Sequence, residues 1–447
     1  MRKHSIIRWT GVATAAALAA SLAACAPSGN AEDVTGASAE EIAAALQEES
    51  SITVWGWAPQ LEPIVEAFEE KYPKIDVKLE NVGTGNDHYT KLQNAIKAGT
   101  GAPDVAQVEY YALPQFALSG AFVDLTNFGA ADLEDEYTAS TWGSVSLNDG
   151  IYALPQDSGP MAMFYREDVF TKLGLEIPTT WDEYIAAGEA IHAANPDAYI
   201  TNDVGDAGFT TSMIWQAGGN PYVVDGTTDV TVDFADEGST KWADTWNQLV
   251  QNDLVAPISS WSDEWYQGLT DGSIATLVIG AWMPGNLESG VPDASGKWRV
   301  APMPTYEEGV AAAAENGGGG DAVLEQSENK LVAYGFLEFL NGEEGAAIHA
   351  ANGGFPSTVA DLESDEFLNH ESEYFGGQKI NEVLVQASKD VVPGWSYLPF
   401  QTYANSIFGD TVGQSYADKS DLNEGLAAWQ EATVKYGVEQ GFTVNGE

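Results

Sequence analysis

The stretch VWGWAPQLEPIVEAFEEKYP, residues 54–73, decides the fold of the amino-terminal half of this chain. It continues a short β-branched run at 52–55, which predicts a strand. Apolar residues then recur at the i, i+3, i+4, i+7 positions of a helix with one buried face: Leu61, Ile64, Val65 and Phe68. Pro73 ends this helix, since the residue before a proline avoids the helical conformation. The stretch therefore predicts a β-α unit.

The same alternation continues on the carboxyl side of this stretch. Apolar and polar residues alternate over 75–79, as they do in a half-buried strand, and a second helix carries Tyr89, Leu92 and Ile96. A buried strand follows at 104–108. The order β-α-β-α-β predicts an α/β layer with a mainly parallel sheet. Further along, the Thr180 to Glu183 phrase predicts a capping box at the head of another helix.

The first residues resemble a bacterial lipoprotein signal. Basic residues are followed by an apolar run over 11–22, which is too short to span about 30 Å of hydrocarbon, and then by Leu-Ala-Ala-Cys25. Cys25 is the only cysteine of the chain, so it has no disulfide partner, and the alternative is a chance cysteine near a cleavage site. We expect a signal peptide over 1–24, a lipid on Cys25 and a flexible tether over 25–49, which is rich in Ala, Ser, Gly and Glu.

The composition excludes several classes of function. The formal net charge is −49, a sign that repels phosphates and anionic lipid heads, so nucleic acid and peripheral membrane docking are not expected. Disorder is excluded as well, because 44% hydrophobic residues and 14 tryptophans fill a large core. A chain of 447 residues exceeds what one core comfortably supports, which predicts two domains.

Four stretches resemble the extracellular solute-binding proteins of ABC sugar importers, the family that includes maltose-binding protein. They are 54–73, then GTGAPDVAQ at 99–107, GIYALPQDSGPMAMFYREDVF at 150–170, and 317–342 together with 351–362. In this order they cover nearly all of the chain beyond residue 50. The resemblance is specific to the family and fixes no ligand.

The resemblance implies a periplasmic-binding-protein-like fold of two α/β lobes joined by three hinge crossings, with the ligand cleft between them. Its first lobe would take 50–155 and 315–352, and its second lobe 156–314 and 353–447. Hinges are expected near Leu154, Pro302 and Phe355. The function implied is capture of an oligosaccharide for the permease subunits of an ABC importer, outside the membrane, by a monomer without a cofactor, a metal or an enzymatic activity.

Ligand residues are expected at strand ends, because a sugar needs an aromatic plate for its apolar face and carboxylates or amides for its hydroxyls. In the first lobe we expect Trp57, Asn86, His88, Glu109, Tyr110, Gly320 and Asp321. Asn86 has an N-cap as its alternative role, and Tyr110 has loop packing. At the first crossing and in the second lobe we expect Asp157, Trp215, Trp282, Trp395 and Tyr397. By contrast, Trp181, Trp242, Trp246 and Trp429 stand at helical spacing and are predicted to be core.

Other functions are weighed against this hypothesis. A secreted glycoside hydrolase also uses paired carboxylates, but 67 acidic residues make such pairs uninformative, and no G-x-S-x-G or P-loop motif occurs. A metal receptor is suggested by Tyr110-Tyr111, yet the five histidines show no ligand spacing. An anion or amino-acid receptor would use a fixed arginine, and only Arg166 and Arg299 lie beyond the signal. A neutral ligand is the expectation.

Overall fold

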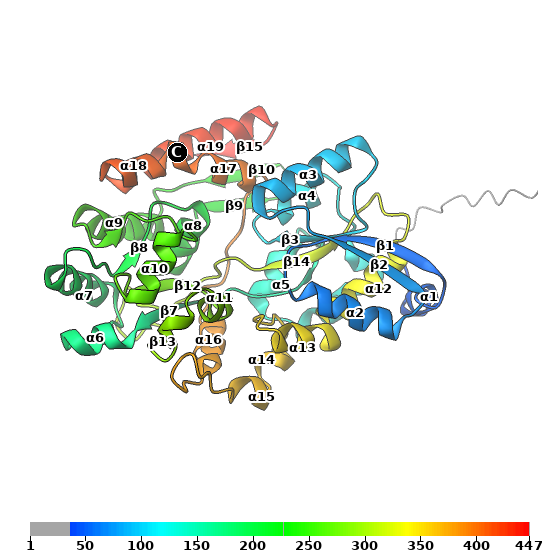
Figure 1. The fold of residues 1–447 in the computed structure, drawn as a ribbon. Coiled ribbons are helices and arrows are strands. Elements are labelled where there is room, and N and C mark those ends of the chain that lie inside the picture. The colour runs from blue at the N-terminus through cyan, green and yellow to red at the C-terminus, as the bar shows by residue number, and fades with distance from the viewer. Residues whose placement is uncertain (1–35, 227, 447) are drawn as a thin grey trace, which may run out of the picture. The chain divides into compact units, whose positions relative to one another are not determined.

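The computed structural model describes residues 36–226 and 228–446. Cys25, the predicted signal peptide and the first part of the predicted tether lie outside these residues. The described residues form one compact unit. Within it, Figure 1 shows one α/β lobe around β1, β2, β3 and β14, and another around β7, β12 and β13, which confirms the predicted fold class. No helix of the described residues is long and apolar enough to cross a bilayer.

The first lobe is built on a five-stranded sheet in the order β2-β1-β3-β14-β6. Its strands are β1 (Ser50–Trp55), β2 (Ile75–Glu80), β3 (Val105–Glu109), β6 (Leu154–Pro155) and β14 (Gly319–Val323). The pairs β1–β2 and β1–β3 are parallel, whereas β14 runs antiparallel to β3 and β6. The carboxyl ends of β1, β2 and β3 therefore meet at one edge of the sheet.

The helices of the first lobe cover this sheet. They are α1 (Ala39–Ala45), α2 (Leu61–Lys71), α3 (Gly85–Ala98), α4 (Leu113–Leu118), α5 (Ala139–Val145), α12 (Lys330–Asn341), α13 (Glu343–Ala351) and α14 (Val359–Leu362), with two 3-10 turns (Leu125–Phe128 and Ala130–Glu136) and a small hairpin of β4 (Ser146–Leu147) and β5 (Gly150–Ile151). The predicted face of α2 is the buried one, since Leu61, Ile64, Val65 and Phe68 are all buried.

The expected tether is wrong in its last part. Residues 39–45 form α1, which begins with a capping box between Ser38 and Glu41. Ile42 and Leu46 are buried, and a Cβ on Gly335 of α12 would collide with both side chains. Helix α12 thus covers an apolar face for which the sequence showed no partner.

The second lobe contains a central sheet, in which β7 (Met161–Arg166) lies between β12 (Thr276–Gly280) and β13 (Trp298–Ala301) and is antiparallel to both. The short parallel pair of β8 (Thr201–Asn202) and β11 (Val255–Ala256) continues it, because Tyr199 bridges Ile274 in parallel beside β12. The order is therefore β11-β8-β12-β7-β13. A separate sheet contains β9 (Tyr222–Asp225), β10 (Asp229–Val232) and β15 (Thr443–Asn445).

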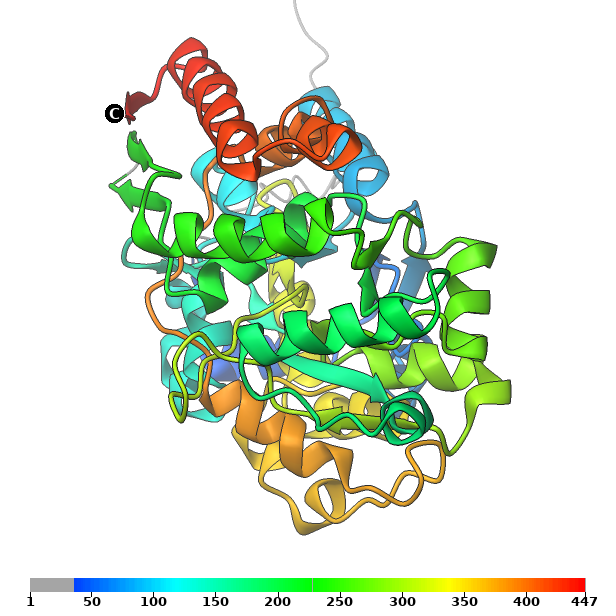
Figure 2. The same ribbon diagram turned by 90° about the vertical axis from the view of Figure 1, so that its left-hand side faces the viewer.

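Helices surround the second-lobe sheets, and in Figure 2 this lobe faces the viewer. They are α6 (Glu167–Leu173), α7 (Trp181–Ala194), α8 (Ala207–Gln216), α9 (Glu237–Gln251), α10 (Asp263–Asp271), α11 (Met283–Gly290), α15 (Asp365–Leu368), α16 (Ile380–Lys389), α17 (Gln401–Ser406), α18 (Val412–Asp418) and α19 (Leu422–Glu439), with 3-10 turns at Pro292–Ala294 and Phe408–Asp410. The capping box of Thr180 and Glu183 begins α7 as predicted. The four tryptophans predicted to be core are at most 2% exposed.

Three crossings join the lobes, and they run side by side as a narrow ribbon. Segment 157–161 pairs with 313–316 through Pro160 and Glu315, and with 355–356 through Asp157 and Pro356. Segment 391–392 of the second lobe flanks the ribbon, where Val391 bridges Ala313. We call these four segments the hinge ribbon.

One expected hinge and one expected lobe boundary are wrong, whereas the boundary between 314 and 315 lies within the observed second crossing. Pro302 is no hinge, because the chain stays in the second lobe after it, where Thr305 bridges Thr180, and crosses only at 313–316. The third crossing also extends beyond residue 353, since Thr358 still bridges Tyr137 of the first lobe. Both errors have the same cause: the crossings are extended segments, fixed by long-range pairing that no local pattern encodes.

Candidate ligand-binding cleft

The first lobe presents Trp57, Glu109 and Tyr111 at the carboxyl ends of β1 and β3. The loop after β1 is held by Gln107, whose Oε1 accepts hydrogen bonds from the backbone N–H groups of Trp57 (2.8 Å) and Ala58 (3.1 Å). A Cβ on Gly56 would lie 2.3 Å from Cδ1 of Leu61, so a larger residue before Trp57 would displace this buried leucine side chain. The half-buried Trp57 is thereby fixed at the sheet edge where an α/β layer binds ligands.

His88 supports this tryptophan and is not a ligand residue, so the prediction for His88 is wrong. Its ring is fully buried, and it meets Trp57 edge to face with the centroids 5.0 Å apart. Burial lowers the pKa of His88 to about 4, so the imidazole is neutral. Asn86 is exposed in the first turn of α3, which starts at the same edge of the sheet.

Glu109 ends β3 and carries the carboxylate of this edge. Its Oε2 accepts a hydrogen bond from the Tyr89 hydroxyl at 3.0 Å, and its backbone N–H donates to the same hydroxyl at 2.9 Å. Burial raises the pKa of Glu109, and the negative charge of Asp206 in the second lobe raises it further. Asp206 is the N-cap of α8, directly after β8. The two carboxylates, one from each lobe, are therefore close enough for their charges to interact.

Tyr110 is buried and is not placed for ligand contact, whereas its neighbour Tyr111 lies at the strand-end edge. Tyr110 is 1% exposed, and its hydroxyl donates to the carbonyl oxygen of Asp157 at 2.7 Å, which ties β3 to the first crossing. Tyr111 is half-buried and close to Glu109, whose charge contributes after burial to raising the Tyr111 pKa. Strand alternation could have found it, because residues 109 and 111 share one face and 110 takes the other.

The hinge ribbon has a face toward this cleft and a face toward α5. On the α5 face, Glu315 accepts hydrogen bonds from Ser140 (2.8 Å) and Ser158 (3.1 Å). Their neighbours Asn316 and Asp157 point the other way, as successive residues of an extended segment do. The Asp157 carboxylate accepts from the Gly319 N–H at 2.7 Å, and burial raises its pKa to about 7.

Gly320 and Asp321 do not line the cleft, so both predictions are wrong. They lie inside β14 between β3 and β6, where a Cβ on Gly320 would come 2.5 Å from the Leu154 oxygen. The Asp321 side chain is fully buried in the first lobe, which raises its pKa to about 7. These residues serve close packing in the sheet, and a glycine-rich stretch by itself does not separate that role from ligand contact.

The second lobe presents Asp206, Trp261 and Trp282 at its own strand ends. They follow β8, β11 and β12, whose carboxyl ends meet at one edge because the three segments are parallel. Trp282 is half-buried, and its Nε1–H donates to the carbonyl oxygen of Asn316 on the hinge ribbon at 2.7 Å. Trp261 was not predicted, since the two residues of β11 are too short to show any alternation.

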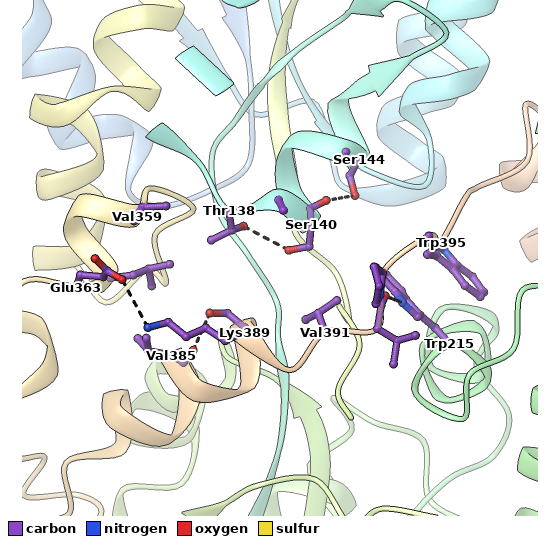
Figure 3. Close-up of a pocket in the computed structure, with 17 residues that line it drawn as sticks. Thr138, Ser140, Ser144, Trp215, Val359, Glu363, Val385, Lys389, Val391 and Trp395 are labelled. Carbon is purple, nitrogen blue, oxygen red and sulfur yellow. Dashed lines mark hydrogen bonds and ion pairs between the residues drawn. The ribbon is translucent and has the colours of Figure 1, made fainter. Parts of the chain in front are cut away.

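Trp215 and Trp395 lie on the α5 side of the hinge ribbon. They border a cavity of about 500 Å³, whose opposite wall is Thr138, Ser140 and Ser144 of the first lobe (Figure 3). The rings stack at 5.1 Å and 7°, so each covers a face of the other. Trp215 is only 4% exposed, and its Nε1–H donates to the Val392 oxygen. Because its ring face is covered and its indole N–H is already bonded, Trp215 is a packed residue, contrary to the ligand role expected of it.

Tyr397 follows this pair, is half-buried and packs edge to face against Trp395 with the ring centroids 5.9 Å apart. Burial raises its pKa, and the charges of Glu315 and Glu109 raise it further. Both arginines are used inside the second lobe: Arg166 binds Asp168 at 2.8 Å and Arg299 binds Glu167 at 2.6 Å. Neither is placed as an anion receptor. In the part of the chain that the structure describes, no three His, Cys, Asp or Glu side chains gather as a metal site requires.

Residues 56–347, more than half of the chain, match the family model of the bacterial extracellular solute-binding proteins. The chain belongs to this family. A solute-binding protein of this kind acts outside the membrane and is a binding component of a transporter, not an enzyme.

Solved structures resemble this solute-binding protein over most of its length. The ABC transporter-associated binding protein of B. animalis subsp. lactis Bl-04, in complex with β-1,6-galactobiose, is 46% identical, with a TM-score of 0.81 over 88% of this chain and 99% of that one. The galacto-N-biose/lacto-N-biose I-binding protein of Bifidobacterium longum, in complex with lacto-N-biose, is 26% identical, with a TM-score of 0.78 over 88% and 98%. Among curated relatives, an arabinooligosaccharide-binding protein of Halalkalibacterium halodurans is 24% identical over 82% of this chain and 85% of its own.

Proposed function

We propose that this protein is the substrate-binding lipoprotein of an ABC importer and captures a neutral β-galactoside of about two to five sugar units between its lobes. The observation that carries the proposal is the pairing of the two strand-end edges. One edge supplies carboxylate and hydroxyl partners at Glu109 and Tyr111, and the other supplies indole surfaces at Trp261 and Trp282. Hydroxyls on a rim and an apolar ring face are what a pyranose offers to such a pair.

The galactoside is favoured by the 46% identical relative, whose structure contains β-1,6-galactobiose. The lacto-N-biose complex of the second relative supports the same sugar class. An arabino-oligosaccharide is the second candidate, because a curated relative bears that name. The two candidates differ in ring size and in the exocyclic hydroxymethyl group, so one titration separates them.

Calorimetric titration of the mature protein tests the ligand. The panel contains β-1,6-galactobiose, lactose, lacto-N-biose, an arabino-oligosaccharide and maltose, with an amino acid, a polyamine and Zn²⁺ as other classes. We expect the tightest binding from a β-galactoside. Tighter binding of the arabino-oligosaccharide would select the second candidate. Binding of a metal or an amino acid, with no detectable binding of any sugar, would overturn both candidates.

The lipid anchor, the permease and the monomeric state complete the proposal. Cys25 would carry the diacylglyceryl group, and two acyl chains give stable attachment where one is marginal. A Cys25→Ala variant is expected to leave the membrane fraction and lose metabolic labelling with palmitate. Retention of the label in that variant would refute lipidation at this residue. Light scattering with and without sugar checks the monomer, and co-purification with the permease subunits checks the partner.

A further inference from the structure

Trp261 is an exposed tryptophan on the strand-end edge of the second lobe. It is 49% exposed, and the other large apolar side chains exposed to a similar degree within the described residues are all valines. Exposure of a large apolar ring to water is unfavourable, and exposed apolar surface of this kind often marks a binding site. Its location after β11 puts it on the same strand-end edge as Trp282.

The backbone at Trp261 is strained. Its φ is +69°, in the left-handed region that bulky side chains avoid. Such strain persists where the surroundings impose it, and it concentrates at ligand sites. Here Asn202 imposes it: its Nδ2 donates to Ile258 O and Ser260 Oγ, both at 3.0 Å, and its Oδ1 accepts from the Trp265 indole at 2.7 Å. Asn202 ends β8, so the loop is held from the neighbouring strand.

The sheet order places Trp261 farther from the hinge than Trp282. Strand β12 lies beside β7, which leaves the first crossing, whereas β11 is the outermost strand. Trp282 also bonds the hinge ribbon directly. The two indoles stack at 5.9 Å and 27°, an offset arrangement that leaves surface on the outer ring. The two rings together form a continuous aromatic surface, with Trp282 nearer the hinge ribbon and Trp261 farther from it.

We propose that Trp261 forms an outer sugar subsite, which receives the ring next to the unit held at Trp282, and that it makes the protein prefer chains longer than a disaccharide. This inference rests on the proposed function, since it assumes a sugar in the cleft. The class of ligand for the subsite is a pyranose ring that presents an apolar face. Its loop is preset by Asn202, so little ordering is needed when the sugar arrives.

Titration of Trp261→Ala with β-1,6-galactobiose and β-1,6-galactotriose tests the subsite. In the parent protein we expect tighter binding of the trisaccharide. In the variant we expect about a 10- to 30-fold loss for the trisaccharide and less than about a 3-fold loss for the disaccharide. Val438→Ala, at a side chain that is 55% exposed on α19, is the matched surface control and should change neither affinity.

The outcomes separate this inference from the proposed function. If the parent protein binds neither galactoside, the proposed function fails and the subsite with it. If the parent binds but the variant loses both sugars equally, or neither, only the outer subsite is overturned. Trp261→Gly checks the strain independently: glycine adopts a positive φ freely, so this variant should melt no lower than Trp261→Ala while showing the same binding loss. A lower melting temperature for the glycine variant would refute the strained loop.

Discussion

Two tryptophan pairs lie near the boundary of the lobes and differ in what their faces touch. We call Trp215 with the half-buried Trp395 the buried pair, and Trp261 with the half-buried Trp282 the exposed pair. The buried pair is nearly parallel, and Trp215 is 4% exposed. The exposed pair is offset, and Trp261 is 49% exposed. Only the exposed pair follows the carboxyl ends of parallel strands.

This difference teaches that richness in tryptophan does not locate a sugar site. A ring must have a free face, and it must stand where polar partners from the other lobe can reach the same ligand. The exposed pair meets both conditions, because Trp261 has a free face and Glu109 of the first lobe is close enough to Asp206 of the same edge for their charges to interact. The buried pair fails the first condition, since each ring covers a face of the other and the Trp215 indole is bonded to the Val392 carbonyl, although polar residues of the first lobe line the same cavity.

Replacing Trp215 by alanine is expected to have the largest effect, and on stability. Truncation of a buried tryptophan lowers the free energy of unfolding by about 3–5 kcal/mol. Sugar affinity should change by less than about 3-fold if this pair is packing. Urea denaturation and calorimetry on one preparation measure both. A variant that keeps its stability but no longer binds sugar would show that Trp215 contacts the ligand, contrary to the packing role given to the buried pair.

Trp282→Ala is expected to act mainly on binding. We expect at least about a 100-fold loss of affinity, or about 3 kcal/mol, because the inner ring face of the cleft disappears. Stability should fall by only about 1–2 kcal/mol, as the hydrogen bond to Asn316 is lost from a half-buried residue. Trp282→Phe is the control that keeps a flat ring without the Nε1–H, and it should retain most of the affinity. If stability falls as far as in Trp215→Ala, Trp282 is core.

Glu109→Gln tests whether the carboxylate at the first-lobe edge contributes to sugar binding. The amide oxygen can still accept from Tyr89, so the local structure is kept, but the charge that strengthens hydrogen bonds to sugar hydroxyls is removed. We expect about a 10-fold loss of affinity, near 1.4 kcal/mol. The exposed Asp76→Asn on β2 is a charge-matched control away from the strand end. Equal affinities in both variants would show that Glu109 does not contact the ligand.

The last expected effect, from Asp321→Asn, is on the pH dependence of stability and not on sugar affinity. The folded pKa of Asp321 is about 7, above the ordinary value of 3.8, so the folded state keeps a proton that the unfolded state has released. Stability should therefore fall as pH rises from about 4 to about 7, with this group giving at most about 1.4 kcal/mol per pH unit. Burial also raises the pKa values of Asp157 and Asp203, so these two groups make stability fall with rising pH as well.

Thermal melts of the parent protein and the variant between pH 5 and 8 measure this slope. The Asp321→Asn slope should be flatter, because the amide does not titrate. The exposed Asp197→Asn serves as the control and should keep the parent slope. An unchanged slope in Asp321→Asn would mean that this carboxyl is ionised in the folded protein despite its burial.

Much of the fold was predictable because its signals are local. The β-α-β-α-β order after residue 50, the buried face of α2, the Thr180 capping box and the core tryptophans all follow from periodicity and capping within a few residues. The Tyr111 position was also within reach of strand alternation. The failures at His88, Gly320 and Asp321 share another cause: each stands near a strand end or a glycine run, but the residue is buried inside the lobe.

The sequence by itself determined the α/β class, the amphipathic faces and the family, because these depend on residue spacing and on phrases read along the chain. Tertiary structure alone decided which aromatic rings are free. Trp215 and Trp395 are 180 residues apart and bury each other, while Trp261 is placed beside Trp282 by a two-residue strand and by Asn202. A side chain's exposure is set by the surfaces packed around it, and those surfaces come from distant segments that no local pattern describes.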